Sequence, residues 1–307
     1  MHVLITGIGG FVGPRLARHL LETGHRVSGT WLENTPPPKL EEGVDLYHAD
    51  LLDPASLEKA VRLSSPDAIV NLAGLSHVGE SWKRPGEYFQ VNVIGTENLL
   101  DAAAGRPVVI ASSAEVYGPV PEDEQPIDEE RPVDPRSPYA LTKAAAERLA
   151  LQRGAVVARA FNLVGPGQAA TFAMPSFASQ LAGIASGAAE PVLRVGNLSA
   201  RRDFVHVDDG SAAFRILAER GHPGHVYNIA SGQACSIAEA LERLMAVSGV
   251  RAEVRQEADR MRPVDLPLLL GGAHRLRRLG WEPRRSLDDA LLDLWNDSRG
   301  EAQARAC

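Results

Sequence analysis

The stretch TGIGGFVGPRLARHLLETGH, residues 6–25, follows a short apolar run at the start of the chain. Its glycines Gly7, Gly10 and Gly13 recur at every third position, and an amphipathic helical pattern follows them. Glycine backbone lets a pyrophosphate approach closely, and the N-terminus of the next helix attracts the anion. Pro14 fits the first helical turn, where amides lack helical partners. The stretch therefore predicts a strand–loop–helix unit that binds a dinucleotide, the alternative being an ordinary tight turn.

Short apolar strands alternate with helical patterns along most of the chain. The expected strands are HVLIT, RVSGT, DLYHA, AIVNLA, VVIAS, VVARAF and HVYNIA, and the expected helices cover residues 13–23, 54–63, 85–104, 139–153 and 207–219. This alternation is typical of a parallel sheet with helices on both faces. We therefore predict an α/β fold, a doubly wound parallel sheet of the Rossmann type.

Two parts of the chain interrupt this alternation and predict a second, smaller α/β domain. We assign residues 1–164 and 201–232 to the dinucleotide-binding domain, and residues 165–200 and 233–307 to a substrate-binding domain. The second domain is expected beside the carboxyl ends of the strands, where open α/β sheets bind ligands. The acidic, proline-rich stretch 118–138 is expected to be a loop, either solvated or bordering the substrate entrance.

The composition limits the class of protein and its partners. The chain has 307 residues, of which 44% are hydrophobic, as expected of a soluble globular protein with a large core. Its net charge of −7, without a basic stripe, argues against binding to nucleic acid. The start of the chain is too short for a signal peptide and no apolar run suits a membrane, so we expect a cytoplasmic protein. Cys235 and Cys307 form no disulfide or metal-binding pattern, and no metal site is expected.

A tyrosine and a lysine stand one helical turn apart in SPYALTKAAAERLA, residues 137–150. Ser137 suits the N-cap and Pro138 the first helical position, so Tyr139 and Lys143 share one face of the helix. A cation beside a phenol lowers its pKa by about 1–3 units. Tyr139 is therefore expected to exchange a proton near neutral pH, the alternative being a chance pairing on the surface.

The end of the second strand bears on the choice of dinucleotide. NAD sites usually place Asp or Glu there, and NADP sites place an arginine nearby. This chain has Trp31 at that position, and Glu33 comes two residues later. The cofactor is expected to be NADP or NAD, and the sequence leaves both open.

Several motifs together resemble the extended short-chain dehydrogenase/reductases that modify nucleotide sugars. They are TGIGGFVG, Ala49-Asp50, NLAG at 71–74, Val91-Asn92, SSAEVYG at 112–118 and the Tyr139/Lys143 pair. Later segments resemble the branch that acts on GDP-linked hexoses: FNLVGPGQ at 161–168, VGNLSARRDFVHVDD at 195–209, MRPVDLP at 261–267 and LGWEP at 279–283. The resemblance extends from Gly7 to Pro283, which is nearly the whole chain.

The resemblance implies roles for individual residues. Those implied at the cofactor are Gly7, Gly10, Phe11, Val12, Gly13, Trp31, Asp50, Leu51, Leu72, Ala73, Gly74, Asn92, Tyr139, Lys143 and Phe161. Those implied at a GDP-hexose substrate are Ser76, His77, Ser113, Asn162, Val195, Arg202, Arg262 and Asp265. His77 is equally well explained as a structural polar residue, and Asp203 is an alternative partner for Arg202.

The implied catalytic set is Ser113, Tyr139 and Lys143, with Glu115 as an additional acid or base. Tyr139 would protonate the oxygen of a ketone that accepts hydride, and Ser113 would hydrogen-bond that oxygen. The expected reaction is NAD(P)H-dependent reduction of GDP-4-dehydro-6-deoxy-D-mannose to a GDP-6-deoxyhexose such as GDP-D-rhamnose. Alternatives are a GDP-mannose 4,6-dehydratase, for which Glu115 is suited, a nucleotide-sugar 4-epimerase, and a non-catalytic NAD(P)-binding sensor.

The helix expected at 139–153 is rich in alanine on more than one face, more than a one-sided surface helix requires. Together with the helix expected at 85–104, it is predicted to pack against a second copy of the chain as a homodimer, as in the family that the chain resembles. The alternative is burial of this helix against its own sheet.

Overall fold

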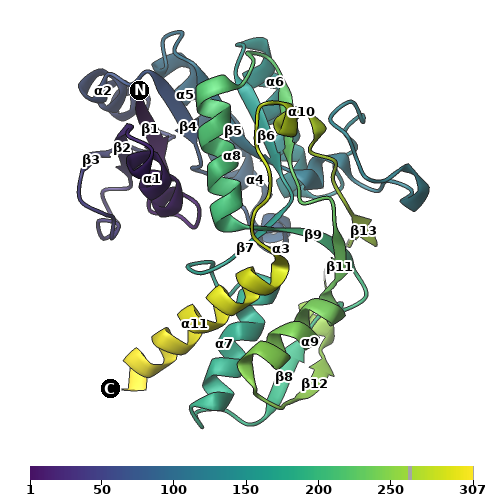
Figure 1. Ribbon diagram of the computed structural model, residues 1–307. Coiled ribbons are helices and arrows are strands. Elements are labelled where there is room, and N and C mark those ends of the chain that lie inside the picture. The colour runs from purple at the N-terminus through teal and green to yellow at the C-terminus, as the bar shows by residue number, and fades with distance from the viewer. Residues whose placement is uncertain (262–264, 307) are drawn as a thin grey trace.

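The computed structural model describes residues 1–261 and 265–306 (Figure 1). Its main sheet has seven parallel strands in the order β10-β6-β5-β4-β1-β2-β3. The strands are β1 (His2–Thr6), β2 (Arg26–Trp31), β3 (Val44–His48), β4 (Ala68–Asn71), β5 (Val108–Ser113), β6 (Val156–Ala160) and β10 (Val226–Ile229). The strand order reverses between β1 and β4, where sheets of this kind bind ligands at the carboxyl ends. The predicted Rossmann-type sheet is confirmed.

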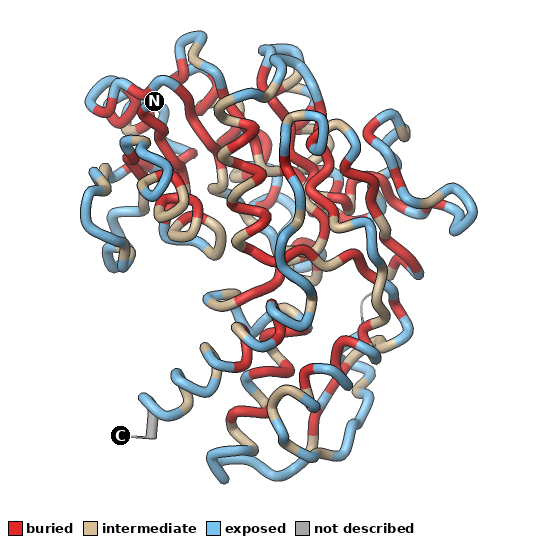
Figure 2. Tube along the Cα trace, in the orientation of Figure 1, coloured by how far each residue is buried: buried red, intermediate tan, exposed pale blue. Residues whose placement is uncertain are grey.

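Helices cover both faces of this sheet. One face carries α1 (Gly13–Glu22) and α8 (Val207–Arg220), and the other carries α2 (Pro54–Ser64), α5 (Gly95–Ala102) and α6 (Pro138–Gln152). Successive strand residues point to opposite faces. In β1, Val3 and Ile5 therefore join the core under α1 and α8, whereas Leu4 joins the core on the other face. Figure 2 shows the central strands buried between these layers.

The helix expected at 85–104 consists of three consecutive pieces. It comprises α4 (Pro85–Phe89), a π-helical turn (Gln90–Ile94) and α5, and the shorter α3 (Val78–Lys83) precedes it. The π-helical turn contains Asn92, whose side chain is buried. Turns of this kind are common at functional sites, and this one lies beside the start of α6.

A second hydrophobic core lies below the main sheet in Figure 1. It is formed by α7 (Ala173–Ala185), α9 (Ile237–Ser248), α11 (Leu287–Ala306) and β8 (Val192–Val195), and the exposed β12 (Glu253–Gln256) pairs with β8. A small sheet joins the two parts, with β11 (Ala234–Ser236), β9 (Arg201–His206), β13 (Leu268–Leu269) and β7 (Asn162–Val164). Short 3₁₀ turns are η2 (Ala114–Tyr117), η3 (Glu122–Glu124) and η4 (Ala258–Arg260).

The C-terminal segment returns to the first core before it enters the second. Leu266, Leu276 and Trp281 pack in the core under α1 and α8, and α10 (His274–Arg278) contacts β10. The boundaries expected from the sequence assign this segment to the second domain. The segment packs with the first domain because α10 covers β10, the edge strand of the main sheet.

The acidic stretch 118–138 is anchored in its middle. The amide of Ile127 donates to the Leu270 carbonyl, and the Gly272 amide donates to the Ile127 carbonyl, both at 2.8 Å. Glu129 is buried and accepts the backbone N–H of Asn228 at 3.0 Å. The stretch is therefore tied to the β10 edge rather than being solvated throughout. Among the described residues, no helix combines the length and the apolar character needed to cross a membrane.

Candidate active site

The glycine loop leaves room for a pyrophosphate at the start of α1. Gly7 has φ +68°, and an added Cβ would lie 2.8 Å from the Ala73 backbone. At Gly13 an added Cβ would lie 2.2 Å from the Ile8 carbonyl oxygen, so both positions require glycine. The N-cap residue Val12 makes no side-chain cap, and no acidic residue occupies the first turn. The first amides of α1 are therefore free to bind an anion, and the loop fits the predicted dinucleotide.

Three of the residues predicted at the cofactor, Trp31, Asp50 and Leu51, have structural surroundings within the chain. Trp31 at the end of β2 contacts His48, with ring centroids 3.9 Å apart. Asp50 accepts the Leu52 amide at 2.9 Å, and Leu51 is buried in the core beside α2 and α5. These contacts fix the wall of the site but do not discriminate between NAD and NADP.

Asn92 connects the loop after β4 to α6. Its Oδ1 accepts the Leu75 amide at 2.8 Å, and its Nδ2 donates to the Leu75 carbonyl and to Thr142 Oγ1, each at 3.0 Å. A Cβ added at Gly74 would lie 2.8 Å from Asn92 Oδ1 and 3.5 Å from Lys143 Nζ. The loop Leu72-Ala73-Gly74 is therefore held against the lysine. Direct contact between Asn92 and the cofactor stays a prediction.

Tyr139, Lys143 and Ser113 converge where α6 meets the end of β5. Helix α6 begins as predicted, with the Ser137 hydroxyl accepting the Ala140 amide at 3.1 Å and Pro138 in the first turn. Lys143 Nζ donates to the Ala111 carbonyl at 2.9 Å. Ser113 accepts the Glu115 amide at 3.2 Å, and its hydroxyl lies close enough to the Tyr139 phenol to act on the pKa of that group. The Ser113 hydroxyl thus caps the turn that begins at Ala114 and also lies beside the Tyr139 phenol.

Burial is the main influence on the pKa values of Tyr139 and Lys143. It raises the pKa of Tyr139 above its ordinary value, although the hydrogen bond with Ser113 acts in the opposite direction. The expectation that this pKa is lowered is wrong, because desolvation of the phenol dominates. Burial also lowers the pKa of Lys143 to about 8, against the charge of Glu147, which raises it. Tyr139 is therefore protonated at neutral pH, as a proton donor must be.

His77 joins the two parts of the molecule. Its Nδ1 accepts the Glu80 amide at 3.0 Å at the start of α3, so the ring proton lies on Nε2. Nε2 then donates to the Thr171 carbonyl at 3.0 Å, and the ring contacts that of Phe172. The structural alternative for His77 therefore has direct support, while Ser76 beside it is exposed.

Arg202 and Asp265, both predicted at the substrate, form an ion pair of 2.5 Å. Asn197 donates to the same carboxylate at 2.7 Å. Asp203, the alternative partner of Arg202, instead accepts the amide and hydroxyl of Ser231 at 2.8 and 2.6 Å. The structure thus brings together two residues that lie far apart in the sequence, the buried Arg202 of β9 and the half-buried Asp265.

Four other predicted residues have different outcomes. Val195 is fully buried in the second core, and its contact with substrate stays a prediction. Phe161 is buried against Gly271 in the first core, and its cofactor contact stays a prediction. Asn162 is half-buried on β7 opposite Phe204. Arg262 lies outside the described residues.

A family model described as GDP-mannose 4,6 dehydratase matches residues 4–294. The chain belongs to the GDP-mannose 4,6 dehydratase family. GDP-6-deoxy-D-mannose reductase of Pseudomonas aeruginosa is 36% identical over 96% of both chains. The structure of RMD from Pseudomonas aeruginosa complexed with NADPH has a TM-score of 0.85 at 35% identity, covering 98% of this chain and 99% of that one. A Thermus thermophilus UDP-glucose 4-epimerase in complex with NAD has a TM-score of 0.88 at 28% identity, with the same coverage.

This member of the GDP-mannose 4,6 dehydratase family also has a buried ion pair behind the lysine, which sequence reasoning missed. Glu147 lies one turn beyond Lys143 and binds Arg159 of β6 at 2.7 Å. Ser112 donates to the same carboxylate at 2.5 Å, and the Arg159 guanidinium lies 4.7 Å from the centre of the Tyr117 ring. This ion pair could have been expected from Arg159 in the apolar strand VVARAF, because a buried charge requires a partner.

Proposed function

We propose that the protein reduces a GDP-4-keto-6-deoxyhexose to a GDP-6-deoxyhexose, with NADPH or NADH as the hydride source. The observation that carries the proposal is that the Ser113 hydroxyl lies beside the Tyr139 phenol, one helical turn from the Lys143 ammonium that is hydrogen-bonded to β5. The similarity to GDP-6-deoxy-D-mannose reductase supports GDP-4-dehydro-6-deoxy-D-mannose as substrate and GDP-D-rhamnose as product. The open N-terminus of α1 supports a dinucleotide cofactor.

The bound nicotinamide would supply hydride to the carbonyl carbon of the sugar. Tyr139 donates its proton to the carbonyl oxygen, and the Ser113 hydroxyl hydrogen-bonds that oxygen. Lys143 then stabilises the phenolate and relays a proton back to it. Proton donation of this kind contributes about 10²–10⁴-fold to a rate. Because its pKa is raised, the Tyr139 phenol is protonated before hydride transfer.

The nucleotide sugar is proposed to bind between the end of the main sheet and the second core. Arg202 is the proposed ligand of the pyrophosphate, since arginine binds phosphate oxygens through paired N–H groups. Its ion pair with Asp265 orients the guanidinium. Ser76, Asn162 and Arg262 are proposed to complete the site.

A GDP-mannose 4,6-dehydratase is the second candidate. Glu115 lies near enough to Tyr139 to raise the pKa of the phenol. A carboxylate in that place is suited to remove the proton beside a new ketone, a step that dehydration requires and reduction does not. The description of the matching family model favours the same activity.

An absorbance assay separates these two candidates. The purified protein is mixed with GDP-4-dehydro-6-deoxy-D-mannose and either NADPH or NADH, and the band of the reduced nicotinamide is followed. Loss of the band with formation of a GDP-6-deoxyhexose is expected. An unchanged band, together with conversion of GDP-mannose to its 4-keto-6-deoxy derivative by tightly bound oxidised cofactor, would favour the dehydratase.

We also propose that the protein is a homodimer. Three large apolar side chains on adjoining helical segments are exposed: Phe89 at 48%, Ile94 at 40% and Leu141 at 55%. They belong to α4, the π-helical turn and α6, which contact one another within the chain. A second copy that presents the same face would cover them. We place the enzyme in the cytoplasm, which the free thiol of Cys235 fits.

A further inference from the structure

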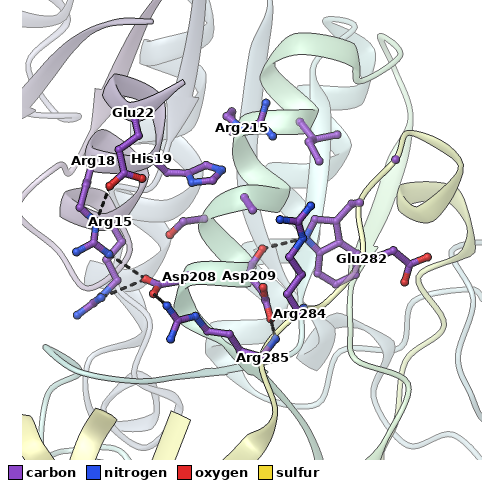
Figure 3. Close-up of a pocket in the computed structure, with 15 residues that line it drawn as sticks. Arg15, Arg18, His19, Glu22, Asp208, Asp209, Arg215, Glu282, Arg284 and Arg285 are labelled. Atoms are coloured by element: carbon purple, nitrogen blue, oxygen red, sulfur yellow. Dashed lines mark hydrogen bonds and ion pairs between the residues drawn. The ribbon is translucent and has the colours of Figure 1, made fainter. Parts of the chain in front are cut away.

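A cavity of about 510 Å³ lies between α1, α8 and the segment 280–285 (Figure 3). Because α1 and α8 cover the face of the sheet opposite to α6, this cavity is separate from Tyr139 and Lys143. None of the glycines of the pyrophosphate loop belongs to the described residues that line it. Its volume is in the range of about 300–1,000 Å³ that small-molecule sites occupy.

Nitrogen donors in the wall of this cavity lack partners. The buried atoms His19 Nε2 and Arg215 Nε have no hydrogen-bond partner among the residues that the structure describes. Arg284 uses its backbone amide to bind Asp209, and its guanidinium has no ion pair within the described chain. Figure 3 shows these three side chains coming from α1, α8 and the C-terminal segment around the same cavity. Buried donors normally have acceptors, so the two buried nitrogens of His19 and Arg215 leave the wall incomplete without one. The exposed Arg284 adds a third donor at its rim.

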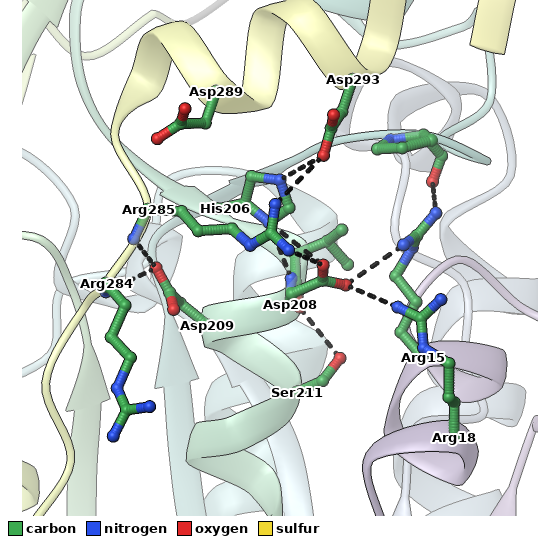
Figure 4. Close-up of polar contacts among 12 residues, drawn as sticks. Arg15, Arg18, His206, Asp208, Asp209, Ser211, Arg284, Arg285, Asp289 and Asp293 are labelled. Atoms are coloured by element: carbon green, nitrogen blue, oxygen red, sulfur yellow. Dashed lines mark hydrogen bonds and ion pairs between the residues drawn. The ribbon is translucent and has the colours of Figure 1, made fainter. Parts of the chain in front are cut away.

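The acidic residues of the wall, in contrast, are already engaged. Asp208 binds Arg15 at 3.1 Å, Arg18 at 3.4 Å and Arg285 at 3.3 Å (Figure 4). The remaining acidic groups also have partners: Asp209 with the amides of Arg284 and Arg285, Glu282 with Arg277, and Glu22 with Arg18. The cavity therefore offers unused donors while its acceptors are satisfied, which favours an anionic ligand.

We propose that this cavity binds a phosphorylated small molecule whose phosphate oxygens accept hydrogen bonds from His19, Arg215 and Arg284. Phosphate presents several acceptors at once, and arginine binds them with directed N–H groups. Burial, together with the charge of Arg215, lowers the pKa of His19, so its ring is neutral and donates to the ligand in the tautomer that carries the proton on Nε2. The part of the cavity lined by Ile216 and Trp281 holds the organic portion.

Calorimetric titration with inorganic pyrophosphate tests this site. The full-length protein is first saturated with NADPH, so that pyrophosphate does not enter the glycine loop. Arg284→Gln removes one donor without breaking an ion pair in the described chain, and binding is expected to weaken about tenfold. Arg278→Gln is the matched control, because Arg278 is exposed on α10 and lies outside the cavity. Its affinity is expected to equal that of the parent protein.

A second variant removes a different donor of the same cavity, so that the test does not depend on the folding of a single variant. His19→Leu removes the unpartnered ring nitrogen and is expected to weaken binding about threefold. Equal affinity in Arg284→Gln and the parent, or no heat of binding at millimolar pyrophosphate, would overturn the proposal. Citrate is titrated at the same ionic strength, and binding as tight as that of pyrophosphate would overturn the assignment to a phosphorylated ligand.

Discussion

The ammonium nitrogen of Lys143 lies 2.9 Å from the carbonyl oxygen of Ala111 and donates a hydrogen bond to it. Ala111 and Ser113 belong to β5, whereas Tyr139 and Lys143 belong to α6. The bond therefore fixes the helix relative to the strand, and the proposed catalytic set has one rigid support. It also holds Lys143 in a buried place, where desolvation lowers the pKa of the ammonium.

The rate of carbonyl reduction is expected to fall as the pH rises through about 8, because Lys143 loses its charge with a pKa of about 8. Glu147→Gln removes a negative charge that raises this pKa, so the pKa decreases and the alkaline limb moves to lower pH. The pH dependence of kcat/KM, which reports the groups of the free enzyme, measures both effects. Glu242→Gln, an exposed position on α9, serves as the control and leaves the limb in place. A limb that moves to higher pH in Glu147→Gln would contradict this explanation.

The ion pair between Glu147 and Arg159 is buried, and replacing one partner is expected to be costly. Glu147→Gln leaves an uncompensated buried guanidinium, so the free energy of unfolding decreases by about 3–5 kcal/mol. Replacing both residues with methionine removes both charges and recovers most of that loss. Urea unfolding of the three proteins measures the difference. A loss of less than about 1 kcal/mol in Glu147→Gln would mean that Arg159 is solvated after all.

His77→Asn separates two functions of one side chain. Asparagine is a good N-cap residue and keeps the bond to the Glu80 amide, but it is too short to reach the Thr171 carbonyl. Thermal stability is therefore expected to change little, while amide hydrogen exchange over residues 171–176 becomes faster. Mass-spectrometric hydrogen exchange gives both readouts against the parent protein. Unchanged exchange in this segment would show that His77 does not hold it.

The proposed dimer is tested by placing charges on its apolar face. Phe89→Glu combined with Leu141→Glu introduces carboxylates at two exposed positions, and burying them against a second copy is unfavourable. Sedimentation is expected to show a dimer for the parent and a monomer for the variant, with unchanged secondary structure. Leu63→Glu is the control, because Leu63 is an equally exposed leucine on α2 and outside this face. A parent protein that sediments as a monomer would rule out the dimer.

The sequence was most informative where structure depends on local interactions. Gly7 and Gly13 are required because a side chain at either position would collide with nearby backbone. Helix α6 begins at Ser137-Pro138, where the Ser137 hydroxyl accepts the amide of Ala140, three residues later. The parallel sheet followed from the alternation of strands and helices. These features depend on neighbours in the chain, which a single sequence displays directly.

Features that depend on distant partners were missed or wrongly predicted. The ion pair of Arg202 with Asp265 and the bond of His77 to Thr171 join residues more than sixty positions apart, and no spacing rule indicates them. The pKa of Tyr139 was expected to fall because the lysine was visible in the sequence, whereas the burial that raises it was not. The burial of Val195 in the second core was not visible in the sequence for the same reason, since it depends on tertiary packing.

The comparison of Tyr139→Phe with the parent in the reduction of GDP-4-dehydro-6-deoxy-D-mannose by NADPH tests the central claim most directly. Tyr47→Phe, on the edge strand β3, controls for loss of a phenol elsewhere. The proposed role of Tyr139 as proton donor predicts that kcat falls about 10²–10⁴-fold in Tyr139→Phe, with unchanged affinity for NADPH and no loss in Tyr47→Phe. A Tyr139→Phe variant that oxidises NADPH at the parent rate would contradict that role.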